Sequence, residues 1–205
     1  METDTAMIAI TTARPEEFAA AAAVLADAFT DDPVALGILP AQADRQRKLT
    51  HLFTAVLRSG PGPRGAVDVA RREGDEQIIG VAAWESPAAR RGALTRELAQ
   101  MPLFLKAFGA AGIPRAMTME HRLQRHRPAE PHWYLADIGV GAAKQGLGVG
   151  SALLRARLEY VDRTGLPSYL EASTPDNRRL YARFGFREIA PIDGIPNASP
   201  VAMLR

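Results

Sequence analysis

Three glycines on alternate residues dominate the segment KQGLGVGSALL, which runs from Lys144 to Leu154. This segment follows the β-type run WYLADIGV (133–140) and leads into an apolar pattern with helical spacing. Backbone N–H groups in such a turn, with a helix N-terminus behind them, bind the phosphate of a dinucleotide, a nucleoside triphosphate or coenzyme A. The segment therefore predicts a strand–loop–helix unit and leaves the phosphate ligand open.

Strand and helix patterns alternate on both sides of this loop. They predict a strand over 133–140, helices over about 148–164 and 175–184, and strands over 168–172, 185–190 and 200–204. Thr174 followed by Pro175 is typical of a helix start, and Gly165 is typical of a helix end. Strands on both sides of helices predict an α/β fold with a mixed sheet.

The first part of the chain has weaker patterns. They predict strands over 8–12, 66–72 and 77–85, helices over 16–29 and 41–58, a loop over 60–65 and a helical segment over 88–127 that breaks near Gly112 and Pro114. Gly74 predicts a hairpin turn between the second and third strands, and Asp31-Asp32-Pro33 predicts the end of the first helix. A chain of 205 residues can bury one sizeable core, so residues 1–205 are predicted to form a single domain.

Composition excludes several classes of protein. The absence of cysteine excludes disulfides, thiolate zinc sites and cysteine nucleophiles, and the four histidines lack metal-ligand spacing, so we expect no metal. A net charge of +2 is too small to favour nucleic acid, and no apolar run approaches the roughly 18 residues of a membrane span. The acidic start is unlike a secretory signal, which predicts a cytoplasmic protein. A homodimer is compatible with these features.

Charge is nevertheless unevenly distributed along the chain. Residues 1–44 contain eight Asp or Glu and one Arg, whereas residues 88–127 contain eight Lys or Arg and two Glu. This asymmetry is typical of differently solvated faces, and it also fits a cationic ligand near the acidic segment and an anionic ligand near the basic one.

The spacing inside the loop distinguishes the three phosphate ligands. Glu171 supports a dinucleotide turn, but Ser151 stands where that turn has Gly or Ala, and the first glycine lies too far from the strand. A Walker-type loop needs a Lys between Gly150 and Ser151. The remaining pattern is Gln145, two residues, Gly148, one residue and Gly150.

This pattern resembles the coenzyme A signature of the GNAT N-acetyltransferase superfamily, in which Arg or Gln precedes the two glycines by the same spacing. WYLADIGV before the loop and NRRLYARFGF (177–186) after it resemble the superfamily too. ADAFTDDP (26–33), the helical segment before the central strand, HRPAEPHWYLADIGV (126–140) and LEAS (170–173) further resemble the puromycin N-acetyltransferase group. The resemblance implies a GNAT fold with splayed central strands and a helical insertion before the central strand.

The resemblance also implies acetyl-CoA as co-substrate and a small-molecule amine, such as an antibiotic or amino-nucleoside, as acceptor. The loop would hold the pyrophosphate, the strand would bind pantetheine, and Asn177 would lie near the sulfur. The implied cofactor-binding residues are Ile138, Gly139, Val140, Gln145, Gly146, Leu147, Gly148, Val149, Gly150, Ser151, Asn177 and Tyr181. On the strand, strict alternation puts Trp133, Leu135, Asp137 and Gly139 on one face, and Gly139 indicates a bulge or a close approach by another segment.

Three residues are candidates for the chemistry. Tyr181 falls where the superfamily has its usual general acid, although helical periodicity alone favours core packing. Glu171 and Asp137 are candidate bases on adjacent strands, with charge pairing at strand ends as the alternative. His132 is a remote alternative base, otherwise a surface or packing residue.

Asp32, Trp84 and Glu85 are candidates for contact with the acceptor. Asp32 stands where the puromycin enzyme has Tyr, so the resemblance does not imply puromycin itself, and the residue is equally typical of a helix end. Trp84 and Glu85 fit a core aromatic and an edge charge as well. The main alternative function is a non-catalytic acyl-CoA-binding or regulatory domain, against which Tyr181, Asn177 and the two candidate bases argue.

Overall fold

The computed structural model describes residues 7–205, in which seven strands form one mixed sheet in the order β1-β2-β3-β4-β5-β7-β6. The strands are β1 (Ile8–Thr12), β2 (Gly65–Arg72), β3 (Gly80–Glu85), β4 (Trp133–Val140), β5 (Ser168–Ala172), β6 (Arg187–Pro191) and β7 (Val201–Leu204). Only β4 and β5 run parallel, and all other neighbouring strands are antiparallel. The predicted mixed sheet is confirmed.

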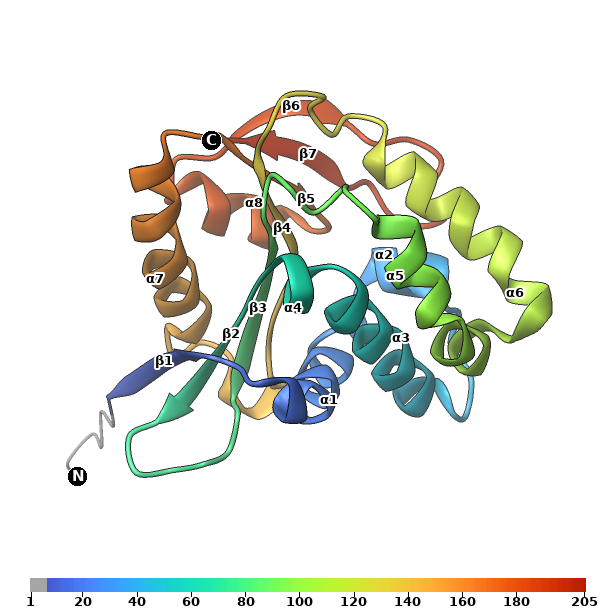
Figure 1. Ribbon diagram of the computed structural model, residues 1–205, viewed down its shortest axis with the longest axis horizontal. Helices are drawn as coiled ribbons and strands as arrows, with labels where there is room; N and C mark the ends of the chain where they lie inside the picture. Colours follow the sequence, from blue (N-terminus) through green and yellow to red (C-terminus); the bar gives the residue numbers. More distant parts are fainter. Residues whose placement is uncertain (1–6) are drawn as a thin grey trace.

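Helices cover both faces of this sheet (Figure 1). They are α1 (Phe18–Ala28), α2 (Pro33–Ile38), α3 (Arg45–Ser59), α4 (Pro61–Arg64), α5 (Ala93–Ala99), α6 (Met101–Gln124), α7 (Val149–Thr164) and α8 (Pro175–Ala182), with 3-10 turns η1 (Pro15–Glu17) and η2 (Ala142–Lys144). The predicted helical insertion before the central strand β4 is α5 and α6. Thr174 caps α8 through its side chain, and Gly165 ends α7 with a positive φ of 67°, as the sequence predicts.

Three hydrophobic clusters hold the layers together. One lies between the sheet and α7 and includes Leu153, Leu154 and Leu158, and a second joins the sheet to α1 and α3. A third cluster packs Met119 of α6 against Tyr169 of β5. The third cluster therefore places α6 over the face of the sheet on which Tyr169 lies.

A bulge in the β3–β4 pair changes which side chains of β4 share a face. Asp137 pairs with Ala83 and Leu135 pairs with Trp84, so Ala136 is an extra residue and the register shifts at this point. As a result Leu135 and Ile138 face the α7 cluster, whereas Asp137 is on the opposite face. The expectation of strict alternation, with Asp137 on the face of Leu135, is wrong for this reason.

Three local expectations also differ from the structure. Asp31-Asp32-Pro33 ends α1 but also begins α2, and the segment expected to be a loop contains the single turn α4. The break in the insertion lies at Gly109, with φ 64° and ψ 165°, and Pro114 lies inside the following helical segment. Glycine adopts this backbone conformation without a steric penalty, which permits the break at this position.

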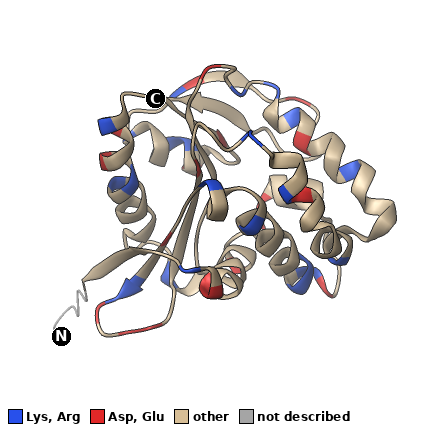
Figure 2. Cartoon of the chain, in the orientation of Figure 1, with Lys and Arg blue, Asp and Glu red and all other residues tan. Residues whose placement is uncertain are grey.

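Figure 2 shows that α6, in the basic segment, carries both signs of charge. Within residues 7–205 no helix has the length and apolarity needed to cross a membrane.

Candidate active site

The glycine loop joins β4 to α7 and exposes its backbone. Gly146 and Gly148 have φ values of 79° and 78°, in the left-handed region that favours glycine, and a Cβ at either position would meet no atom within 4 Å. Within the described residues, the N–H groups of residues 146–151 donate no hydrogen bond. Several free donors and the positive end of the α7 dipole therefore face open space, which fits a pyrophosphate.

Two features hold the start of this loop: contacts with α1 and a hydrogen bond back to β4. Asp27 Oδ2 on α1 accepts a hydrogen bond from the Ala142 N–H at 2.8 Å. The Gln145 side chain donates to the carbonyl of Val140, the last residue of β4, at 3.4 Å. A Cβ at Gly139 would lie 2.7 Å from Ala28 Cβ. Gly139 thus permits the close approach of α1, and the bulge lies nearer the start of β4.

The central strands β4 and β5 pair at only two positions, Trp133 with Ser168 and Tyr134 with Tyr169. Beyond these pairs the two strands no longer bond to each other, which matches the expected splay. The β5-facing edge of β4 then has backbone groups available for an extended ligand such as pantetheine, which can bind as an added strand.

Two half-buried carboxylates, Glu171 and Asp137, lie beyond the last paired residues of β5 and β4. Burial raises the pKa of Glu171 to about 8, and the charge of Glu120 on α6 adds to this effect while a hydrogen bond from Tyr134 opposes it. Burial also raises the pKa of Asp137 to about 7, assisted by the charges of Glu120 and Glu85. Both groups can therefore exchange protons near neutral pH, as a general base requires.

Tyr181 packs in the core on the α7 side of the sheet, and nearby carboxylate charges act on it. Its ring is 5% exposed and packs edge-to-face on Phe186 at a centroid distance of 6.0 Å. Burial raises its pKa, and the charges of Asp32, Asp137 and Glu171 raise it further. The phenol therefore keeps its proton at neutral pH and can donate it.

Asn177 lies one turn before Tyr181 on α8. Its backbone N–H donates to the Thr174 hydroxyl at 3.2 Å, and its side chain donates to the Ser173 hydroxyl at 3.0 Å. Asn177 thus contributes to the start of α8, and its contact with the cofactor stays a prediction.

The candidate acceptor residues have different surroundings. Asp32 caps α2, since its Oδ1 accepts from the N–H groups of Val34 and Ala35, both at 2.9 Å. Asp32 thus follows the end of α1 and also begins α2, and its charge acts on Tyr181 and Asp137. Trp84 has no exposed surface and belongs to the core on the α7 side, so it does not line an accessible acceptor pocket.

Glu85 belongs to a network of polar side chains that sequence reasoning did not find. Arg127 donates to Glu85 Oε2 at 2.8 Å and to His132 Nε2 at 3.1 Å, and its guanidinium lies 3.9 Å from the ring centroid of Tyr134. The Tyr134 hydroxyl donates to Glu171 at 2.8 Å. Of the two expectations for His132, surface or packing, the structure bears out packing, because the residue is 5% exposed.

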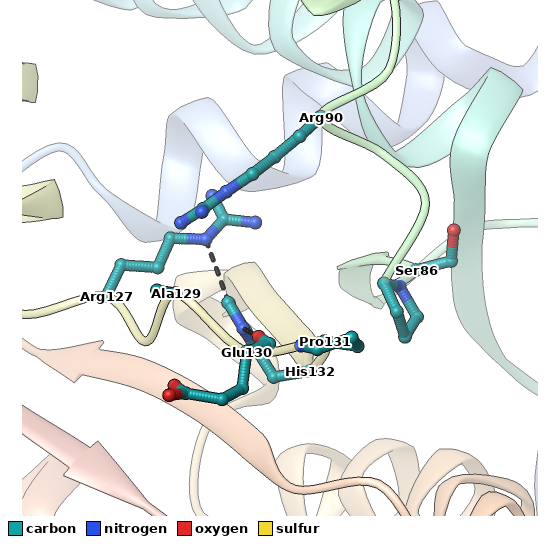
Figure 3. Close-up of a pocket in the computed structure, with 8 residues that line it drawn as sticks. Ser86, Arg90, Arg127, Ala129, Glu130, Pro131 and His132 are labelled. Atoms are coloured by element: carbon teal, nitrogen blue, oxygen red, sulfur yellow. Dashed lines mark hydrogen bonds between the residues drawn. The ribbon is translucent and has the colours of Figure 1, made fainter.

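A small pocket lies beside Arg127 and His132 (Figure 3). It has a volume of about 80 Å³ and is lined by Ser86, Pro87, Arg90, Arg127, Ala129, Glu130, Pro131 and His132. The register of the sheet, which pairs Glu85 with Tyr134, brings together parts of this network that lie far apart in the sequence. Among residues 7–205 no group of three or more His, Asp or Glu side chains is arranged to hold a metal ion.

Comparisons with known proteins agree with this architecture. The model of the acetyltransferase (GNAT) family matches residues 41–186, so the chain belongs to the GNAT family of N-acetyltransferases. An uncharacterized N-acetyltransferase of Schizosaccharomyces pombe is 29% identical over 182 residues, which are 83% of this chain and 71% of the relative.

Two solved structures extend the comparison. A Corynebacterium glutamicum structure described as histone acetyltransferase HPA2 and related acetyltransferase superposes with a TM-score of 0.74 and 30% identity, over 96% of this chain and 94% of the other. An N-acetyltransferase from Staphylococcus aureus shares the fold, with a TM-score of 0.64 and 19% identity over 96% of this chain and 100% of the other.

Proposed function

We propose that this chain transfers the acetyl group of acetyl-CoA directly to the primary amine of a small molecule, as a single domain. Acetyl-CoA supplies the acetyl group as a thioester. The observation that carries the proposal is the row of free N–H groups over residues 146–151, on the loop that directly follows β4. The two carboxylates, on β5 and β4, have pKa values of about 8 and about 7, which suit proton transfer. The charge of Asp32, which acts on Tyr181 and Asp137, favours a cationic amine but does not identify it.

The residues of this chain have separate tasks in the proposed reaction. Glu171 takes a proton from the acceptor ammonium, directly or through a water molecule, so that the neutral nitrogen can attack the acetyl carbonyl. As the C–N bond forms, the C–S bond breaks and the electron pair stays on sulfur. Tyr181 donates its hydroxyl proton to that thiolate. The nitrogen, which is positively charged after the attack, loses its second proton, which reaches the tyrosinate through solvent, and Glu171 releases its own proton to solvent.

The test is thiol release by the purified protein with acetyl-CoA and a panel of primary amines, puromycin included. Amine-dependent release of one thiol per acetylated amine supports the proposal. Binding of acetyl-CoA without turnover of any amine would instead favour the acyl-CoA-binding domain.

Replacing Tyr181 by Phe tests its task as the proton donor. We expect kcat to fall by roughly 100-fold at neutral pH, with unchanged affinity for acetyl-CoA. The deficit should shrink as the pH rises past about 8.5, the ordinary pKa of a thiol, because a thiolate then leaves without needing a proton. The pH dependence of kcat measures this, and Tyr160→Phe, at an exposed position of α7, is the control. An unchanged kcat in Tyr181→Phe would exclude this task.

A further inference from the structure

The two oxygens of Glu171 have different surroundings. Oε2 accepts a hydrogen bond from the Tyr134 hydroxyl at 2.8 Å, whereas Oε1 is buried and has no hydrogen-bond partner among the described residues. A buried carboxylate oxygen without a partner is unfavourable in a resting protein. The Tyr169 hydroxyl, also buried and without a partner, acts on Glu171 and lowers its pKa. Oε2 is therefore the oxygen held by a hydrogen bond, and Oε1 is the one left free to take up a proton.

Tyr134, the donor to Oε2, is itself held by a cation. The guanidinium carbon of Arg127 lies 3.9 Å from the centroid of the Tyr134 ring, and the ring of Tyr169 packs nearby at a centroid distance of 6.0 Å. A planar guanidinium over an aromatic face is attractive and restricts the orientation of both groups. The Tyr134 ring loses this contact if it turns away from Glu171.

Two acceptors on other segments fix Arg127, whose side chain is 7% exposed. Glu85 Oε2 accepts from its Nη2 at 2.8 Å, and His132 Nε2 accepts from its Nε at 3.1 Å, the contact drawn in Figure 3. Because Nε2 accepts, the ring proton of His132 is on Nδ1, which donates to the Glu130 carbonyl at 2.7 Å. Burial and the charge of Arg127 lower the pKa of His132, which favours this neutral form.

We propose that Tyr134 and Arg127 are positioning residues for Glu171: the tyrosine hydroxyl fixes Oε2, the arginine fixes the tyrosine, and Oε1 is thereby left as the proton-accepting atom. This inference rests on the proposed function, in which Glu171 is the base. The Tyr134 hydrogen bond is compatible with both states of Glu171, since a proton taken up on Oε1 leaves Oε2 as an acceptor. Neither positioning residue needs to touch the acceptor.

The hydroxyl of Tyr134 also affects the ionisation of Glu171. A hydrogen bond to a carboxylate stabilises its charged form, so this bond opposes the effect of burial on the Glu171 pKa. Loss of the hydroxyl should therefore raise that pKa further. A purely structural role of Tyr134 would not move it.

Tyr134→Phe tests the inference, because it removes the hydroxyl and keeps the ring under Arg127. We expect the acidic limb of the pH profile of kcat/KM for the amine to move upward by about one pH unit, with an unchanged KM for acetyl-CoA. Tyr160→Phe on α7 should leave the limb in place. A folded Tyr134→Phe protein with an unmoved limb would overturn the inference.

A double-mutant cycle with Glu171→Gln shows whether Tyr134 acts through Glu171. In the Glu171→Gln background, Tyr134→Phe should cause less than a twofold further change in kcat/KM, because the group it positions is gone. Equal fold-losses in both backgrounds would contradict the inference.

Titration of the Glu171 carboxyl by carbon-13 NMR in the resting protein separates this inference from the proposed function. The resonance is assigned by its loss in Glu171→Gln, and its pKa should be higher in Tyr134→Phe than in the parent protein. If the parent protein acetylates no amine, the proposed function fails, whereas this titration still decides whether Tyr134 controls the ionisation of Glu171. An equal pKa in both proteins would overturn the inference even if turnover is found.

Discussion

Gly148→Glu is expected to raise the dissociation constant of coenzyme A at least 100-fold. The substitution puts a negative charge into open space at the N-terminus of α7, beside N–H groups that have no hydrogen-bond partner among the described residues. Two like charges about 4 Å apart near a protein surface repel by about 4 kcal/mol, which is more than enough for this effect. Calorimetric titration with coenzyme A measures it, and added salt should reduce the difference.

Gly165→Glu is a matched control for this substitution. Gly165 ends the same helix with φ 67°, has open space around its Cβ like Gly148, and accepts the same side chain at the same steric cost of about 1–2 kcal/mol. We expect a comparable strain on the backbone and unchanged binding of coenzyme A. Equal affinities for coenzyme A in the two variants would show that the glycine loop does not hold the pyrophosphate.

The strand–loop–helix unit could be predicted from the sequence because its determinants are local. Gly146 and Gly148 are required by their positive φ values, and Thr174 and Gly165 mark helix ends through contacts within a few residues. The expectations for the fold that were incomplete also concern short local segments. Asp32 was recognised as a helix end, but its second effect, the capping of α2, depends on a turn that the sequence pattern did not reveal.

The candidate site was less predictable because its residues meet through long-range pairing. The bulge opposite Ala83 and Trp84 moves Asp137 to the face opposite Leu135, and a period of two cannot anticipate an extra residue. Arg127 is in a basic segment that resembled a solvated face, yet it is nearly buried between elements. Its hydrogen-bond acceptors are Glu85 on β3 and His132 just before β4. These acceptors reach Arg127 only when the sheet is folded, and its burial follows from them.

Glu171→Gln is expected to lower kcat/KM for the amine by about 10² to 10⁴-fold, with unchanged affinity for acetyl-CoA. Only the ionised form of Glu171 accepts a proton, and its pKa is raised to about 8, so the activity of the parent protein should rise with pH up to about 8 and then level off. Glutamine keeps an oxygen for the Tyr134 hydroxyl but has no titrating group. The limb near pH 8 should therefore disappear in the variant, as measured by thiol release from pH 6 to 10.

Asp137→Asn distinguishes the two carboxylates in the same assay. The pKa of Asp137 is raised to about 7, so a limb near pH 7 that disappears in Asp137→Asn and survives in Glu171→Gln would assign the base to Asp137 instead. We expect the opposite result, because Oε1 of Glu171 is the buried oxygen left without a partner.

Stability measurements separate a loss of chemistry from a loss of fold in Glu171→Gln. The folded-state pKa of Glu171 is higher than its ordinary value of 4.5, so the folded protein binds more protons than the unfolded chain between these two values. The contribution of Glu171 to stability is thus fully present below pH 4.5 and declines as the pH rises to about 8. Glutamine is not subject to this decline, so the Tm of Glu171→Gln should exceed that of the parent protein at pH 8 and the difference should narrow toward pH 5. An inactive variant that melts lower than the parent at pH 8 would mean that the substitution damages the fold, and Glu171 would lose its assignment as a buried base.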